Sequence, residues 1–277
     1  MTEDKPYSDW LVASDIDGTL NNKKRKLPHC NLEAITDFVN KGGHFTLASS
    51  RNPQSMYRHY RNLPISTPGI VTNGAGIYDF SKKEYVQFSP MSEKTIEQIC
   101  MLKKKYPTLD AVIVTKDMLY ISGIGLWSVF YVMIDRLTHK YSPDINRVPK
   151  ENWGKVIING PWWRVKKAKK VFAKVEDRDF DLVDTSFVSF ELLPKGVNKG
   201  SAVLKLAEML GLDKKNTAAI GDYYNDLKML KAVGVSACCG QAPNAMKAIA
   251  DYVACHCNEG AVADFLNYLE KNIIKKS

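Results

Sequence analysis

Short apolar runs alternate with amphipathic stretches at the beginning of the chain. Apolar runs at residues 10–14, 44–48 and 69–72 predict three strands, and Asp15 directly follows the first of them. Between the first two runs, apolar residues recur at helical spacing over residues 32–39 and predict a helix. Strands that alternate with helices in this way indicate a parallel sheet with crossover connections.

The end of the chain repeats this alternation. The expected strands lie at residues 217–220 and 234–237, and the expected helices at residues 202–210, 227–230, 243–250 and 261–273. Both ends of the chain therefore have the pattern of one α/β sheet.

The middle of the chain differs from both ends. It is rich in aromatic residues, and Ser92 is placed to cap a helix. Further elements are expected there, namely a helix at residues 165–175 and strands at residues 109–115, 118–122 and 187–193. We therefore predict an α/β fold with a Rossmann-like parallel-sheet core, formed by residues 1–82 and 194–277, and an inserted α+β domain at residues 83–193.

Composition bounds the class of protein. Hydrophobic residues make up 45% of the 277-residue chain and charged residues 25%, which is ordinary for a soluble globular protein. No stretch approaches the roughly 18 consecutive apolar residues of a membrane span, and the first residues lack the apolar segment of a secretory signal. We expect a cytoplasmic protein without a membrane partner. Its six cysteines do not predict disulfides, and Cys255-His256-Cys257 lacks the usual spacing of a zinc site.

The chain is basic, with 39 Lys and Arg against 30 Asp and Glu and a formal charge of +9. Much of the excess lies in short runs at residues 23–26, 103–105, 166–170 and 275–276. Such runs are usually solvated faces, and no known nucleic-acid-binding motif accompanies them. We therefore expect no nucleic-acid partner.

Two carboxylates follow the first expected strand, in Asp15-Ile16-Asp17-Gly18-Thr19-Leu20. Ligand sites in open parallel sheets form outside the carboxyl ends of the strands. If the backbone stays extended, Asp15 and Asp17 point to the same side, because the side-chain period is two. Neighbouring carboxylates are costly unless a cation or a shared proton separates them. By itself, the run fits an Asp-Gly turn after a buried strand equally well.

Further polar residues lie at the same expected edge of the sheet. Ser49 follows the second strand, Lys199 precedes a helix, and Asp222, Asn225 and Asp226 follow the strand at residues 217–220. Each also has a plain structural interpretation, as a helix cap, a surface lysine or turn residues. Together, however, carboxylates, a hydroxyl, an amide and an ammonium are the groups that handle a phosphoryl group beside a hard cation.

These four segments resemble the four motifs of the haloacid dehalogenase (HAD) superfamily. Residues 15–19 resemble its first motif, Ser49 its second, Lys199 its third and residues 221–226 its fourth. The insertion between the second and third motifs, together with Thr72-Asn73-Gly74-Ala75, resembles the Cof-like phosphatase branch.

One motif departs from that branch. Ser50 stands where the branch commonly has Gly, and Ser49 stands where it often has Thr. Serine keeps the hydroxyl, so the role of the second motif is retained.

The resemblance implies a Mg²⁺-dependent phosphatase that hydrolyses small-molecule phosphate monoesters, either sugar or cofactor phosphates, through an aspartyl-phosphate. It implies that Asp15 is the nucleophile and that Asp17 is the acid and base, for which a raised pKa is expected. Ser49 and Lys199 complete the implied catalytic set. The implied substrate-binding residues are Ser49, Ser50, Arg51, Asn73 and Lys199. The implied Mg²⁺ ligands are Asp15, the main-chain carbonyl of Asp17, Asp222, and Asn225 or Asp226 directly or through water.

The resemblance also implies that the insertion is a cap that supplies substrate specificity. Other functions stay open at this point. A phosphomutase or phosphotransferase of the same superfamily would use the same nucleophile, and a catalytically silent binding protein would keep the fold without turnover. The sequence leaves both a monomer and a homodimer open.

Overall fold

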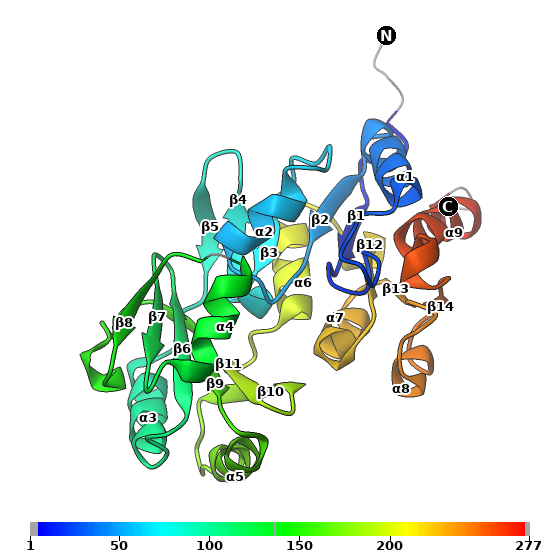
Figure 1. Ribbon diagram of the computed structural model, residues 1–277. Coiled ribbons are helices and arrows are strands. Elements are labelled where there is room, and N and C mark those ends of the chain that lie inside the picture. The colour runs from blue at the N-terminus through cyan, green and yellow to red at the C-terminus, as the bar shows by residue number, and fades with distance from the viewer. Residues whose placement is uncertain (1–4, 136, 275–277) are drawn as a thin grey trace. The chain divides into compact units, whose positions relative to one another are not determined.

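The computed structural model describes residues 5–135 and 137–274, and these form two compact units (Figure 1). One unit consists of the chain up to Val86 together with the chain from Asn198 onward, and the other is Gln87–Val197. The divisions lie a few residues beyond the expected ones at residues 82 and 193. The first unit is thus built from both ends of the chain, and the second is continuous in sequence.

A parallel sheet forms the centre of the first unit. In the described residues its strand order is β14-β13-β12-β1-β2. The central strand β1 (Leu11–Ser14) pairs in parallel with β2 (His44–Leu47) and with β12 (Thr217–Gly221). Beyond β12 lie β13 (Val235–Cys238) and β14 (Tyr252–Val253), also parallel. The expected Rossmann-like parallel sheet is confirmed.

Helices cover both faces of this sheet. They are α1 (His29–Asn40), α2 (Pro53–Tyr60), α6 (Lys199–Met209), α7 (Leu227–Ala232), α8 (Asn244–Lys247) and α9 (Ala261–Asn272). Successive side chains of a strand point to opposite faces. Val12 therefore packs into the core with α1 and α9, whereas Leu11 and Ala13 pack into the core with α6 and α7. The expected helix at residues 243–250 is shorter than predicted.

Three further strands, the last of which extends two residues past Val86, form a smaller sheet in the order β3-β4-β5. They are β3 (Gly69–Val71), β4 (Gly76–Asp79) and β5 (Glu84–Phe88). A parallel bridge between Ala48 and Ile70 places the start of this sheet beside the end of β2. The third strand expected from the sequence is thus present, although it belongs to the smaller sheet.

The second unit is a mixed sheet with helices. In the described residues its strand order is β10-β11-β9-β6-β7-β8, with all pairs antiparallel except β7 with β8. The strands are β6 (Asp110–Thr115), β7 (Leu119–Ser122), β8 (His139–Ser142), β9 (Trp153–Asn159), β10 (Phe180–Ser186) and β11 (Ser189–Pro194). The helices are α3 (Glu93–Lys104), α4 (Leu126–Asp135) and α5 (Trp162–Ala173).

Part of this unit was not predicted from the sequence. The central strand β9 is buried along its whole length, so it lacks the alternation that marks a half-exposed strand. The strand expected at residues 187–193 begins only at Ser189, because Phe187 and Val188 form the turn that joins it to β10. Ser92 does cap α3, since its side chain accepts a hydrogen bond from the Thr95 amide.

Short 3₁₀ turns complete the fold. They lie at Thr72–Gly74, Ile145–Arg147, Lys214–Asn216, Tyr224–Asp226 and Cys257–Glu259. None of the described helices is both long and apolar enough to cross a membrane.

Gly74 allows the turn after β3 to touch the start of α6. It has φ +96°, and a Cβ there would lie 2.2 Å from the carbonyl oxygen of Asn198. No real Cβ tolerates such a distance, so only glycine lets these two backbones meet. Asn198 is the N-cap of α6, and the contact therefore fixes the position of Lys199, the first residue of the helix.

We predict that Gly74→Ala lowers the free energy of unfolding by more than about 2 kcal/mol, since the clash adds to a left-handed strain of about 1–2 kcal/mol. Gly211→Ala is the matched control, because Gly211 has φ +72° and nothing lies within 4 Å of the place that a Cβ would occupy. In Gly211→Ala the free energy of unfolding should fall only by the left-handed strain of about 1–2 kcal/mol. Urea unfolding measures both variants, and equal losses would show that the contact with Asn198 is unimportant.

Candidate active site

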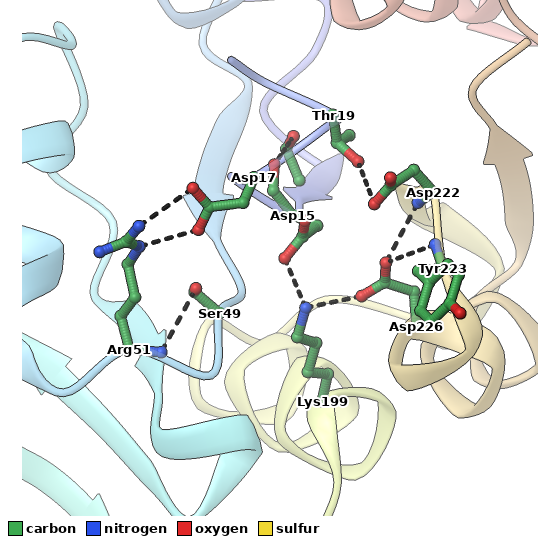
Figure 2. A network of polar contacts seen from close by, with 10 residues as sticks. Asp15, Asp17, Thr19, Ser49, Arg51, Lys199, Asp222, Tyr223 and Asp226 are labelled. Carbon is green, nitrogen blue, oxygen red and sulfur yellow. Dashed lines mark hydrogen bonds and ion pairs between the residues drawn. The ribbon is translucent and has the colours of Figure 1, made fainter. Parts of the chain in front are cut away.

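Several loops bring polar side chains together at the carboxyl ends of the core strands (Figure 2). Asp15 follows β1, Ser49 follows β2 after one residue, and Asp222 follows β12. Lys199 reaches the same place from the first turn of α6. The order of strands in the sheet explains this convergence, because β1 lies between β2 and β12.

Lys199 lies at the centre of the cluster. Its side chain is 1% exposed, and its Nζ donates hydrogen bonds of 2.6 Å to Asp15 Oδ1 and of 2.6 Å to Asp226 Oδ1. Burial by itself would lower the pKa of Lys199, but the two carboxylates outweigh it and raise the pKa. The lysine is therefore a fixed, charged ammonium between two acidic side chains.

Asp226 shapes the turn that follows β12. Its other oxygen, Oδ2, accepts hydrogen bonds from the amides of Asp222 at 3.1 Å and Tyr223 at 3.4 Å. Gly221 leaves room for it, because a Cβ there would lie 2.5 Å from the Asp226 Cβ. Both carboxylate oxygens of Asp226 thus have partners. Asn225 lies half-buried in the same turn.

The site fits a hard divalent cation. Asp15, Asp222 and Asp226 each offer a carboxylate oxygen, and these oxygens lie within 4.8 Å of one another. Burial raises the pKa of Asp15 against the opposing effect of Lys199, and burial with the Asp226 charge raises the pKa of Asp222 to about 6. One ammonium does not neutralise three carboxylates, and oxygen-only ligands suit Mg²⁺.

Two residues without an assigned role in the sequence analysis hold the first loop and Asp222. Thr19 Oγ1 donates to Asp222 Oδ1 at 3.4 Å, and Gln241 Nε2 donates to the Gly18 carbonyl at 2.6 Å. Gly18 itself has φ +85°, and a Cβ there would lie 2.5 Å from Asp222 Oδ2. Thr19 lies in the segment that resembles the first motif, whereas nothing near Gln241 in the sequence indicated this contact.

Asp17 points away from the lysine. Its carboxylate accepts two hydrogen bonds from Arg51, one from Nε at 2.9 Å and one from Nη2 at 3.0 Å, and its side chain is 46% exposed (Figure 2). Burial raises its pKa, but the Arg51 guanidinium outweighs burial and lowers it. The expected raised pKa is therefore wrong for this structure. The extended strand ends at Ser14, so the two-residue period does not bring Asp17 beside Asp15.

The loop after β2 is joined to the turn after β3. Ser49 is buried, and its Oγ accepts a 3.3 Å hydrogen bond from the Arg51 amide. The amide of Thr72 donates to the Arg51 carbonyl at 2.8 Å, and the amide of Asn73 donates to the Ser49 carbonyl at 2.9 Å. Thr72 and Asn73 both have φ 56°, an unusual conformation for a β-branched threonine. The structure therefore brings Ser49, Ser50, Arg51 and Asn73 together beside the carboxylates.

Comparison with known proteins shows which family this chain resembles. The family model of haloacid dehalogenase-like hydrolases matches residues 12–266. Pyridoxal phosphate phosphatase YbhA of Escherichia coli K12 is 24% identical over 92% of this chain and 97% of its own length. The HMP-PP phosphatase of Serratia proteamaculans is 26% identical over 93% of this chain and 94% of its own length.

Solved structures share the fold. A haloacid dehalogenase-like hydrolase from Bacteroides thetaiotaomicron superposes with a TM-score of 0.82 at 20% identity, over 94% of this chain and 99% of the other. A HAD subclass IIB sugar phosphatase, BT4131, superposes with a TM-score of 0.78 at 17% identity, over 94% of this chain and 99% of the other. Because the family model spans most of the chain, this protein belongs to the haloacid dehalogenase-like hydrolases.

Proposed function

We propose that this protein is a Mg²⁺-dependent phosphatase that hydrolyses small phosphate monoesters through an aspartyl-phosphate on Asp15. One observation carries the proposal. In a chain of this family, the buried ammonium of Lys199 contacts Asp15 and Asp226 at 2.6 Å, and Asp222 completes a set of carboxylates close enough to share a cation. This arrangement supports the proposal, because phosphoryl transfer through an aspartyl-phosphate requires a carboxylate and positive charge at one point.

Asp15 attacks first. Lys199 hydrogen-bonds its Oδ1, which leaves Oδ2 to approach phosphorus in line with the leaving group. A bond forms between the Asp15 carboxylate and phosphorus, and the bond from phosphorus to the ester oxygen breaks. Asp17, in the protonated form that its ion pair with Arg51 disfavours, gives a proton to that oxygen, so the alcohol leaves in neutral form.

Hydrolysis of the intermediate follows. A water molecule attacks phosphorus, and Asp17 takes the proton that the water loses. The bond between phosphorus and Asp15 then breaks, and inorganic phosphate leaves. Asp17 ends the cycle protonated, as it began, and Asp15 ends it as a carboxylate.

Neutral and cationic donors hold the phosphoryl oxygens in both steps. Ser49 and Lys199 are the principal ones, because both are buried at the end of the sheet. Asn73 is held beside Ser49 by a backbone hydrogen bond and supplies an amide. Ser50 and Arg51 belong to the same loop as Ser49, and their proposed role is to contact the edge of the substrate.

The divalent cation would be held by Asp15, the main-chain carbonyl of Asp17 and Asp222, with Asn225 or Asp226 acting directly or through water. When bound, Mg²⁺ screens the repulsion between the Asp15 carboxylate and the anionic phosphate and stabilises the charge of the transition state. Both oxygens of Asp226 already have protein partners, which favours a role in positioning Lys199 and the Asp222 loop.

We propose that the second unit, Gln87–Val197, is a cap that selects the substrate. A cap that excludes water strengthens the charged interactions of the site. The relatives named above are a pyridoxal phosphate phosphatase, an HMP-PP phosphatase and the sugar phosphatase BT4131. We therefore infer that the substrate is a cofactor phosphate or a sugar phosphate.

We predict that Asp15→Asn abolishes phosphate release while the fold is retained, because the amide is a poor nucleophile. Release of phosphate from p-nitrophenyl phosphate and from a panel of sugar and cofactor phosphates, with Mg²⁺ or with EDTA, measures this. Far-UV circular dichroism checks the fold. Wild-type turnover by the variant would remove Asp15 as the nucleophile, and transfer of phosphate to a sugar without net release would indicate a phosphotransferase.

The ion pair of Asp17 with Arg51 predicts a pH effect. Asp17 must be protonated to act as the acid, so activity falls as pH rises through its pKa, and Arg51 lowers that pKa. Arg51→Met should therefore move the alkaline limb of the kcat/KM profile to higher pH by about one unit or more. Arg51→Lys keeps a cation and should move the limb less. An unchanged limb in Arg51→Met would mean that Asp17 is not the group that titrates.

The carboxylate cluster predicts that Mg²⁺ stabilises the fold. A cation at ten times its Kd adds about 1.4 kcal/mol to the free energy of unfolding, and thermal denaturation detects this as a higher midpoint. In the Asp222→Asn variant, Mg²⁺ should raise the thermal midpoint much less than in the wild type. Asp9→Asn, which alters an exposed carboxylate, should show the wild-type increase. A shift of the same size in Asp222→Asn would place the cation elsewhere.

A further inference from the structure

Helix α5 of the second unit presents a strongly basic outer face. Its residues Trp162–Ala173 include one arginine and several lysines but no acidic residue. The inward side consists of Val165, Ala168 and Phe172. At 3.6 residues per turn, Lys166, Lys167 and Lys170 fall on the opposite side, and all three are exposed.

Exposed aromatic residues lie at the beginning of this helix. Trp162 is 56% exposed and Trp163 57%. The turn between β10 and β11 adds Phe187, which is 92% exposed, and Val188. The amide of Gly160 donates to the Val188 carbonyl at 3.1 Å, so this turn lies beside the start of α5.

The positive charge of this face is only partly neutralised. Lys169, at its edge, forms an ion pair with Asp184, and Arg164 donates a hydrogen bond to Thr108. Within residues 5–135 and 137–274, no acidic side chain forms an ion pair with Lys166, Lys167 or Lys170. The basic face of α5 therefore lies beside exposed aromatic side chains, two at the start of the helix and one in the turn between β10 and β11.

We propose that this part of the second unit binds the surface of a membrane that contains anionic phospholipids. It is called the α5 surface below and consists of Trp162, Trp163, Lys166, Lys167, Lys170, Phe187 and Val188. The lysines supply attraction to lipid phosphates and carboxylates. The aromatic side chains and Val188 enter the headgroup region, where tryptophan is preferred. Binding is peripheral and reversible.

The details of the α5 surface favour a lipid surface over a nucleic acid. Single-stranded nucleic acids stack their bases on open aromatic faces. The two tryptophan rings instead meet edge to face, with an interplanar angle of 88° and centroids 5.9 Å apart. Val188, an aliphatic side chain, adds nothing to base stacking but does partition into lipid. This proposal departs from two sequence-based expectations, that residues 166–170 form only a solvated face and that the protein has no membrane partner. It concerns contact with a membrane surface and requires no membrane-spanning helix.

Sedimentation of the full-length protein with vesicles tests the proposal. Vesicles of phosphatidylcholine with added phosphatidylserine should bind it, and vesicles of phosphatidylcholine alone should bind it much less. The combined substitution Lys166→Gln, Lys167→Gln and Lys170→Gln should weaken binding roughly tenfold or more. Phe187→Ser with Trp163→Ser should weaken it as well, and added salt should weaken binding of the wild type.

Matched controls use α3 of the same unit together with its C-cap residue, Lys105. Lys94→Gln, Lys104→Gln and Lys105→Gln remove the same charge from exposed positions, and Met101→Ser removes an apolar side chain that is 62% exposed. These variants should bind vesicles as the wild type does. Unchanged thermal midpoints show that the surface variants fold.

Two outcomes would overturn the proposal. Equal losses in the α3 and α5 lysine variants would mean that net charge alone drives binding. Absence of vesicle binding would also overturn it, and salt-sensitive binding to single-stranded RNA in that case would assign the α5 surface to nucleic acid.

Discussion

The buried ammonium of Lys199 is the interaction on which the rest of the site depends. Carboxylates that are as close as those of Asp15, Asp222 and Asp226 repel one another strongly away from water. The lysine offsets part of this repulsion and joins the end of β1 to the turn after β12. Removal of Lys199 would leave the buried carboxylates of Asp15 and Asp226 without their cationic partner. A buried charge without a partner costs folding free energy.

Much of the surrounding backbone places this one side chain. The N-cap Asn198 fixes the first turn of α6, and Gly74 lets the turn after β3 pack directly against the Asn198 carbonyl. Asp226 and Gly221 shape the opposite side. In contrast, Asp17 lies in a more open environment with Arg51. The two acidic residues of the first loop thus have pKa values displaced in opposite directions, because burial dominates at Asp15 and raises its pKa, whereas the Arg51 guanidinium outweighs burial at Asp17 and lowers its pKa.

The sequence predicted the parts of this structure that local pattern controls. Apolar runs located β1, β2 and β12, and the residues that follow them located Asp15, Ser49 and Asp222 near one another. The pairing of Asp17 with Arg51 was not predictable, because it depends on the path of the chain after the strand ends. Gln241 was missed for a similar reason, since its partner Gly18 lies at the other end of the chain. In the second unit, β9 was missed because burial on both faces removes the alternating pattern.

The central position of β1 has a consequence for synthesis of the protein. Its neighbour β2 follows closely in sequence, but its other neighbour, β12, begins only at Thr217. As the chain leaves the ribosome, the second unit, which is continuous, emerges before β12 does and can begin to form its own sheet first. The main sheet cannot be completed until the last part of the chain, which contains β12, β13 and β14, has emerged. Until then one edge of β1 is unpaired, and an unpaired strand edge can pair with another chain.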